Sequence, residues 1–291
     1  QAANALTGFG TSVIACGIEI DVERELSIDE TPDGRFGLAI LAFAASSKEL
    51  YKQIPRRVGQ CVLTCPTTAI FGGTREIDHV DPTKKRIDLG KSLRYFGDGH
   101  QISKVIDDVR YWRIPVMDGE FVCEHDVPRF AGIGGGNFLL CGDSVEAVTQ
   151  ACRSAIAAIR KVPGVITPFP GGATRSGSKV GSKYAALFAS TNEAFCPSLR
   201  HHPHNQLAPS TTTVMEVVID GIDGPSISTA MRQGILAAAS SQGGKGLHRI
   251  TAGNYGGKLG RHHYHLHPLL QNGALQNGAL QNGALQHGAE S

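Results

Sequence analysis

The 291-residue chain has few aromatic residues, 6%, and a net charge of only +2. A charge this close to zero gives no basis for binding nucleic acid or a membrane surface. No apolar run approaches the roughly 18 residues that a membrane span needs, and no signal peptide is visible. With 41% hydrophobic and 19% charged residues, the composition predicts a soluble globular protein of one large domain or two small ones, without nucleic-acid or membrane partners.

Several sequence signatures of catalysis are also missing. No serine-hydrolase elbow occurs, no G-x-G-x-x-G leads from a strand into a helix, and H-E-x-x-H and the Walker spacing are absent. The seven cysteines are odd in number and scattered, which indicates reduced thiols in a cytoplasmic protein. Cys61 and Cys65 have a spacing that suits a helical turn as well as a metal pair. No second matched pair follows, so a zinc site is not favoured.

Glycine, in contrast, is plentiful at 36 residues, and turns divide the second half into two β-α-β patterns. "NFLLCG" reads as a strand, residues 144–162 as a helix capped by Asp143 or Ser144, and "GVITPFPGG" as a strand and loop. "TVMEVVIDG", residues 226–240 and "LHRITAG" repeat the strand-helix-strand order. Two such units interleave as an antiparallel sheet with both helices on one face, the ferredoxin-like arrangement.

The first half has the end of one such unit followed by a second. "QAANAL" reads as the last turns of a helix, "TSVIACG" and "LAILAFA" as strands, and "SSKELYKQI" as a helix that Pro55 should end or kink. Residues 75–91 look like a surface excursion, and Asp118-Gly119 joins two strands into a hairpin. We therefore predict an α+β protein of two lobes, each ferredoxin-like (split β-α-β, antiparallel sheet with helices on one face), at 1–122 and 123–270. The QNGAL repeats of 271–291 are expected to be disordered.

Glu216 is the most unusual single residue. Alternation along "TVMEVVID" puts Val214, Glu216 and Val218 on one face of a strand whose two faces are otherwise apolar. A carboxylate there is costly unless it is paired or protonated, so it suggests an acid or base. A glutamate that reaches solvent at the strand edge is the alternative.

Three glycine-rich loops and two histidine-rich segments complete the candidates. "RSGSKVGSKY" leaves a strand and can wrap an anionic or amide-bearing ligand with backbone N–H groups, or be a solvated surface loop. "RYFGDGHQ" and "AGNYGGKLG" are of the same type. In "RHHPHN" and "RHHYHLH", a pattern such as His263, His265 and His267 could bind metal. No acidic or cysteine partner accompanies it at diagnostic spacing, so structural or surface histidines are favoured.

The order of these motifs resembles a known family. "TGFGTSVIACG", "ETPDGR", "RVGQCVLTCPTTAIF", "RYFGDG", "YWRIPVMDGEF", "GGGNFLL", "PFPGG", "SGSKVGSKY", "FASTNEAFCP", "EVVIDG" and "AGNYGGKLG…HLH" follow one another up to about Leu270. Together they resemble formylmethanofuran–tetrahydromethanopterin formyltransferase, in its bacterial form the D subunit of the formyltransferase/hydrolase complex. The resemblance implies a cytoplasmic acyltransferase with an N-terminal proximal and a C-terminal distal lobe.

The resemblance also implies the reaction and its residues. A formyl group would move between the amine of methanofuran and N5 of tetrahydromethanopterin in formaldehyde oxidation, by direct transfer through a tetrahedral intermediate. The carriers are substrates, and no permanently bound cofactor or metal is expected. The chain is expected to form a homotetramer or to be a subunit of the formyltransferase/hydrolase complex. The alternative is a non-catalytic scaffold or carrier-binding subunit of that complex. Catalysis is expected at Glu216, Asn254 and Lys258, and substrate binding at Phe96, Asp98, Gln101, Arg175, Ser178, Lys179, Ser182, Lys183, Asn192 and Tyr255.

Against that family, the opening strand and most of the first helix of the N-terminal lobe are missing from the sequence. The sheet of this lobe would then expose unpaired N–H and C=O groups along an edge. We expect the second lobe to fold well and the first lobe poorly.

Overall fold

The computed structural model describes residues 1–73, 86–175, 177–253 and 261–271. Two compact units divide the chain: residues 1–132 with 168–170, here unit 1, and residues 133–167 with the chain from Gly171 onward, here unit 2. The boundary follows Gly132, whereas the sequence placed it after residue 122. None of the helices in these described ranges combines the length and apolarity that a membrane crossing requires.

Unit 2 is built around one antiparallel sheet in the order β10-β13-β8-β14, with β9 also pairing with β13. Its strands are β8 (Ile133–Gly142), β9 (Val165–Ile166), β10 (Ala173–Thr174), β13 (Thr213–Gly221) and β14 (Leu247–Thr251). Its long helices are α5 (Val145–Ile159), after β8, and α6 (Gly224–Ser240), after β13. Taking β9 and β10 as one broken second strand, the order is 4-1-3-2, which confirms the predicted ferredoxin-like arrangement here.

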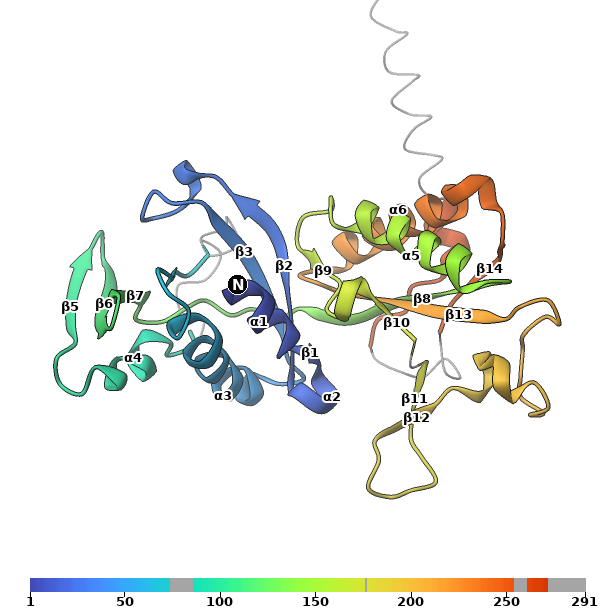
Figure 1. Cartoon of the computed structure of the whole chain (residues 1–291), viewed down its shortest axis with the longest axis horizontal. Coiled ribbons are helices and arrows are strands. Elements are labelled where there is room, and N and C mark those ends of the chain that lie inside the picture. The colour runs from blue at the N-terminus through green and yellow to red at the C-terminus, as the bar shows by residue number, and fades with distance from the viewer. Residues whose placement is uncertain (74–85, 176, 254–260, 272–291) are drawn as a thin grey trace, which may run out of the picture. The chain divides into compact units, whose positions relative to one another are not determined.

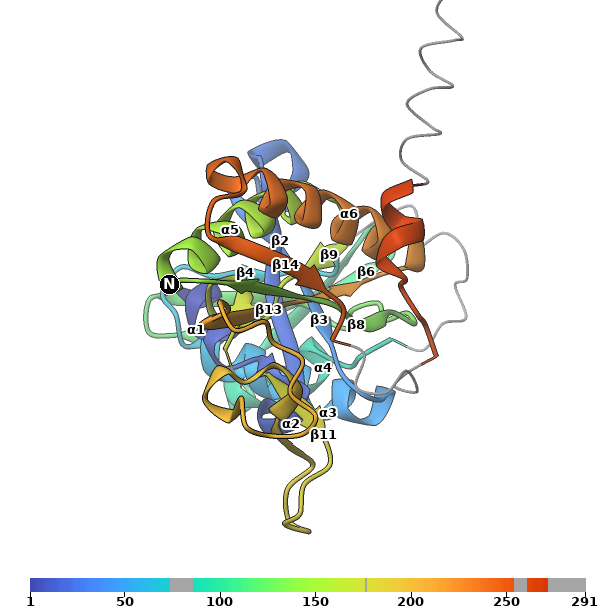
Figure 2. The same ribbon diagram turned by 90° about the vertical axis from the view of Figure 1, so that its right-hand side faces the viewer.

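Both helices cover the same face of this sheet, as Figures 1 and 2 show. Phe138 and Leu140 of β8 and Val217 and Ile219 of β13 point to that face and are fully buried against the helices. Small residues let α5 and α6 approach closely: a Cβ on Gly234 would lie 2.8 Å from the Ile159 side chain. Ser144 caps α5, because its Oγ accepts a hydrogen bond from the Ala147 N–H at 3.3 Å, as predicted.

A second group of short elements in unit 2 lies outside this sheet. The hairpin β11 (Ser178–Val180) and β12 (Ala189–Thr191) is followed by the 3-10 turns η6 (Glu193–Phe195) and η7 (Pro197–Leu199). A further 3-10 turn is η8 (Ser241–Gly244), and residues 266–271 form a helical turn after β14; the 3-10 turn η5 (Pro170–Gly172) begins at the last residue of the segment assigned to unit 1.

The described strands of unit 1 form two sheets. The first has the order β1-β2-β3, from β1 (Thr11–Ser12), β2 (Ile18–Leu26) and β3 (Gly37–Phe43). The second has the order β4-β7-β6-β5, from β4 (Ala69–Ile70), β5 (Ile102–Ile106), β6 (Val109–Val116) and β7 (Gly119–Glu124). The helical elements are α1 (Ala2–Gly8), α2 (Val13–Cys16), η1 (Ile28–Glu30), α3 (Ser47–Val58), η2 (Gly59–Leu63), α4 (Gly90–Leu93) and η4 (Arg94–Gly97).

The core of unit 1 joins α1 and α3 to one face of the β2–β3 hairpin. Leu6 of α1, Ile18 and Ile20 of β2 and Val58 of α3 are all buried in one cluster. A helix, a hairpin and a second helix on the same face are the part of a ferredoxin-like arrangement that the described residues of this unit contain. The α+β class is thus confirmed, and the predicted hairpin at Asp118-Gly119 joins β6 to β7.

One local prediction in unit 1 is wrong, and a second is wrong in one of its two alternatives, the end of a helix at Pro55. "TSVIACG" is a strand only at Thr11–Ser12, because the Ser12 Oγ accepts the Ile14 N–H at 3.3 Å and caps the single-turn helix α2, which ends at left-handed Gly17. Pro55 does not end α3, which continues to Val58 and into the π-helical turn η2. Burial of Arg57 and Val58, and of Cys61, Val62 and Leu63 in η2, outweighs the backbone hydrogen bond that the proline removes.

Candidate functional site

Glu216 lies on the face of the unit-2 sheet opposite to α5 and α6, here called the carboxylate face. Its neighbours Val217 and Met215 point to the helices, so alternation turns Glu216 away from them. The side chain is nevertheless buried, with 6% of its surface exposed. The strand register places Thr174 of β10 on one side of it and Leu139 of β8 on the other. The prediction of a buried strand carboxylate is confirmed, and the solvent-reaching alternative is wrong.

Asn137 of β8 holds the Glu216 carboxylate. Its Nδ2 donates a hydrogen bond to Glu216 Oε1 at 2.6 Å and a longer one to the Gly253 carbonyl at 3.4 Å. The close approach requires glycine at position 253, since a Cβ there would lie 2.8 Å from Asn137 Nδ2. An amide donor to a buried carboxylate fixes its orientation and lowers the cost of burying it. Asn137 was not predicted, although "GGGNFLL" places a polar amide within an otherwise apolar strand.

Asp220 is a second buried carboxylate on β13. Alternation from Glu216 through Val218 brings it to the same face, and it is fully buried. The backbone N–H of Gly135 donates to Asp220 Oδ1 at 3.1 Å. The same period of two that singles out Glu216 would have found Asp220, but its place before Gly221 suggests a turn instead.

A cavity of about 720 Å³ lies at the β14 edge of the sheet, where Met231 and Ile235 of α6 also line it; Glu216 and Asp220 do not line it themselves. Asn137, Thr251 and Gly253 line it together with Gly135 and the segment 262–268. Its volume lies in the range of small-molecule sites.

The predicted loop after β10 divides into locally engaged and exposed residues. Lys179 Nζ lies 2.5 Å from Glu193 Oε1, and this ion pair lowers the pKa of Glu193. Asn192 is buried and caps η6, because its Oδ1 accepts the Ala194 N–H at 3.2 Å. Arg175 and Lys183 are exposed.

Ser182 Oγ accepts the Tyr184 N–H at 3.1 Å, and the ring of Tyr184 lies 5.1 Å from Lys183 Nζ. Ser178 belongs to β11, where its backbone pairs with Thr191. Asn254, Tyr255 and Lys258 lie outside the described residues.

In unit 1 the predicted residues Phe96, Asp98 and Gln101 share the turn that follows α4. Phe96 is 65% exposed, and Asp98 adopts a left-handed backbone with φ of 48°. Gln101 Oε1 accepts the Gly99 N–H at 2.9 Å and so closes the turn. The guanidinium of Arg94 lies over the Tyr95 and Trp112 rings at 4.5 and 5.0 Å. An exposed aromatic ring beside such a stack suits contact with a flat ligand ring.

For a metal ion, the described residues bring together Glu193, His202 and His204, and not His263, His265 and His267. Residues 262–265 have no regular structure and 266–271 are helical, so the second histidine-rich segment does not form the strand that a His-x-His set needs. These histidines instead line the cavity beside Asn137.

The fold and the site define an α+β protein of two lobes, whose ferredoxin-like C-terminal lobe carries a buried, amide-held carboxylate. A family model described as formylmethanofuran-tetrahydromethanopterin formyltransferase matches residues 1–116, and one described as FTR, proximal lobe, matches residues 119–269. The chain therefore belongs to the formylmethanofuran–tetrahydromethanopterin formyltransferase family. Since the model for residues 119–269 is the one named proximal, the expected assignment of proximal to the N-terminal lobe is reversed.

Curated relatives agree over most of their length. The formyltransferase of Rhodopirellula baltica is 61% identical over 279 residues, which are 93% of this chain and 83% of the relative. The D subunit of the formyltransferase/hydrolase complex of Methylorubrum extorquens is 48% identical and covers 94% of this chain and 88% of the relative.

Solved structures agree as well. The formyltransferase/hydrolase complex of Methylorubrum extorquens in complex with methylofuran contains a chain with a TM-score of 0.86 and 46% identity, over 92% of this chain and 87% of that one. The formyltransferase of Methanosarcina barkeri has a TM-score of 0.82 and 41% identity, over 92% and 88%.

Proposed function

We propose that this chain transfers a formyl group between the amine of methanofuran and N5 of tetrahydromethanopterin. The observation that carries the proposal is the buried Glu216 carboxylate, held by Asn137 at 2.6 Å on a lobe that the family model matches. The likeness to a complex solved with methylofuran supports a furan carrier as one substrate.

Formyl transfer between two amines needs balanced proton movements. The attacking amine adds to the formyl carbon, the carbonyl oxygen becomes an oxyanion, and the attacking nitrogen loses a proton. When the tetrahedral intermediate collapses, the C–N bond to the first carrier breaks and that nitrogen gains a proton. A single carboxylate can accept the first proton and return it, which is the role we assign to Glu216. Asn137 then acts as a positioning residue, because it touches Glu216.

The oxyanion requires hydrogen-bond donors that are placed before the reaction. Asn254, Lys258 and backbone N–H groups of the glycine loops are the proposed donors. Loss of one such donor costs on the order of 3 kcal/mol in the barrier.

For substrate binding, the exposed Arg175 and Lys183 remain available for anionic groups of a carrier. Phe96 offers a ring face for stacking, and Asp98 and Gln101 offer polar groups beside it. In the structure Lys179 pairs with Glu193 and Asn192 caps a turn, so their proposed contacts with substrate require these partners to be exchanged or shared. We further propose that the chain works in the cytoplasm, with both carriers as substrates and without a permanently bound cofactor.

The test is formyl exchange between the two carriers by the purified chain and by Glu216→Gln. The variant keeps the shape of the side chain but cannot take up a proton, so kcat should fall by about 10²–10⁴ and the limb of the pH profile due to this carboxyl should disappear. Glu146→Gln, on an exposed position of α5, is the matched control and should keep the wild-type rate. An unchanged rate and pH profile in Glu216→Gln would show that the proton role is wrong.

Direct transfer makes a separate prediction. During turnover the protein mass should stay constant, since no residue is formylated. A formylated protein adduct, observed by mass spectrometry and chased by the acceptor amine, would contradict direct transfer.

The second candidate function is a carrier-binding subunit without transfer activity of its own. The similarity to one component of a larger formyltransferase/hydrolase complex favours this candidate. Exchange assays on the chain alone and with candidate partner subunits separate the two. Carrier binding without exchange in both assays would favour the second function over the first.

A further inference from the structure

The loop at 193–211 in unit 2 is a well-fixed structure without α-helix or strand. Asn205 Nδ2 donates to the carbonyls of Glu193 at 2.9 Å and of Cys196 at 3.0 Å. The Gln206 N–H donates to the Ala194 carbonyl at 2.8 Å. Arg200 donates to the carbonyls of Ala208, at 2.9 Å, and of Thr211. These bonds hold the two ends of the loop together, so side chains that face one another across it are preorganised.

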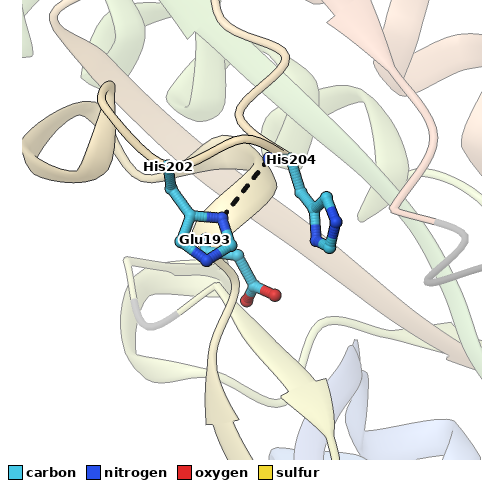
Figure 3. Close-up of side chains that lie close together, drawn as sticks. All are labelled: Glu193, His202 and His204. Carbon is cyan, nitrogen blue, oxygen red and sulfur yellow. Dashed lines mark hydrogen bonds between the residues drawn. The ribbon is translucent and has the colours of Figure 1, made fainter.

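Glu193, His202 and His204 face one another in this loop (Figure 3). Their ligand atoms all lie within 4.8 Å of one another. The two imidazole rings are 5.2 Å apart between centroids and nearly perpendicular, at 77°. Glu193 and His202 are partly buried, whereas His204 is exposed.

We propose that these three side chains form a binding site for a divalent transition-metal ion such as Zn²⁺. Two imidazoles and one carboxylate are a common zinc ligand set, and imidazole also suits Cu²⁺, Ni²⁺ and Co²⁺. Ligand atoms about 2.1 Å from a tetrahedral ion are about 3.4 Å apart. The distances between the ligand atoms must therefore shorten by at most about 1.4 Å when the ion binds. Rotation of the exposed His204 ring can produce this change.

Metal binding breaks one weak hydrogen bond in the loop. The backbone N–H of His204 donates to His202 Nδ1 at 3.4 Å. If the metal ion binds Nδ1, the metal-ligand bond takes the place of this hydrogen bond. If the ion binds Nε2, the ring proton moves to Nδ1, which then no longer accepts the hydrogen bond. Either way, one long hydrogen bond is exchanged for a metal-ligand bond.

Lys179 opposes the metal ion. Its ammonium lies 2.5 Å from Glu193 Oε1, so a dication at the site competes with it for the carboxylate and is repelled by its charge. This predicts an opposite effect of two substitutions: removal of Glu193 weakens metal binding, whereas removal of Lys179 strengthens it. A general loosening of the loop cannot produce that pair of effects.

The experiment is titration of the chelator-treated full chain with Zn²⁺ by calorimetry, and with Co²⁺ followed by visible absorption. His202→Gln, His204→Gln and Glu193→Gln should each weaken binding at least about tenfold, and Lys179→Gln should tighten it several-fold. The matched controls are His201→Gln in the same loop, Lys183→Gln in the same hairpin, and His263→Gln with His265→Gln in the other histidine-rich segment. All of the controls should bind as the wild type does.

Three results would overturn the site. The first is a wild-type chain that binds no Zn²⁺ at millimolar concentration. The second is affinity unchanged within twofold in His202→Gln and His204→Gln. The third is an equal Zn²⁺ affinity of Lys179→Gln and Lys183→Gln, because the Lys179 ammonium beside Glu193 would then have no effect on metal binding.

Discussion

The two units of this chain bury their interiors in different ways. In unit 2 one continuous sheet and two long helices enclose a cluster of seventeen buried hydrophobic residues, whereas the described cluster of unit 1 has eleven and is bordered by two separate sheets. Strand β3 shows the difference, since none of its residues is fully buried and its far edge has no partner among the described strands. The continuous sheet of unit 2 shields from water both the core beneath its helices and the Glu216 carboxylate on its other face. We therefore expect unit 2 to be the more stable unit.

The largest expected effect is a difference in reactivity between the thiol of Cys16 and the buried thiols of Cys123 and Cys152. Burial raises the pKa of Cys152 in unit 2 and of Cys123 in unit 1 to about 12. Partial burial alone would raise the pKa of Cys16 in unit 1, but hydrogen bonds from Ser12 and Thr11 outweigh it, and the pKa lies below its ordinary value. At pH 8 a thiol with a pKa of 12 is thiolate in roughly one molecule in ten thousand.

Iodoacetamide should therefore label Cys16 at least about a thousand times faster than Cys123 or Cys152 in the folded chain, as read by peptide mass spectrometry. In concentrated guanidinium chloride all three should react at similar rates. Fast labelling of Cys152 in buffer would mean that the core of unit 2 opens readily, contrary to the comparison of the units.

Truncation of one buried ring in each unit tests whether they unfold separately. Phe138 of β8 and Phe121 of β7 are both almost completely buried. Phe138→Ala and Phe121→Ala should each cost about 3–5 kcal/mol in the stability of the unit concerned. Calorimetry of the wild type should give two transitions, with each variant lowering only one. A single transition that both variants lower equally would show that the units unfold as one.

A smaller effect is expected from the amide that holds Glu216. Asn137→Ala removes the donor at 2.6 Å and should lower the stability of unit 2 by about 1–3 kcal/mol, because a buried carboxylate loses a hydrogen bond. The rate of formyl exchange should fall as well, with little change in KM. Gly253→Ala, whose Cβ would press on the Asn137 amide, should give the same pattern more weakly. Wild-type stability and rate in Asn137→Ala would contradict the positioning role.

The smallest effect belongs to an exposed turn of unit 1. The Ser27 N–H at 2.9 Å, and then Arg24 at 2.6 Å, lower the pKa of Glu30 to about 2. Because the pKa is depressed in the folded state, the stabilisation is present above the unfolded value of about 4.3 and is lost as the pH falls from there towards 2. The melting temperature of Glu30→Gln should thus lie below that of the wild type at pH 6, and the two melting temperatures should converge near pH 2. Added salt should shrink the difference, and Asp29→Asn serves as the neighbouring control.

Several elements could be predicted because their signals are local. Alternation predicted the bounds of β13 to within a few residues. Helical spacing predicted the cap of α5 at Ser144, and turn chemistry predicted the hairpin at Asp118-Gly119. Glu216 was found for the same reason, since a single carboxylate interrupts a regular apolar strand. The failures at "TSVIACG" and at Pro55 show the limit: a serine cap and a buried helix face, each dependent on neighbours, reversed the local preference.

By itself the sequence determined the α+β class, the two β-α-β patterns of unit 2, the family and the buried glutamate, since all of these depend on order and periodicity along the chain. Only the tertiary structure decided that Asn137 binds Glu216, that Asp220 shares its face, that Lys179 is paired with Glu193, and that His202 and His204 meet this glutamate. The physical reason is that pairing of strands and closure of loops join residues far apart in the sequence, such as Asn137 and Glu216, which are 79 positions apart. Such contacts depend on register and burial, which a pattern along one strand does not contain.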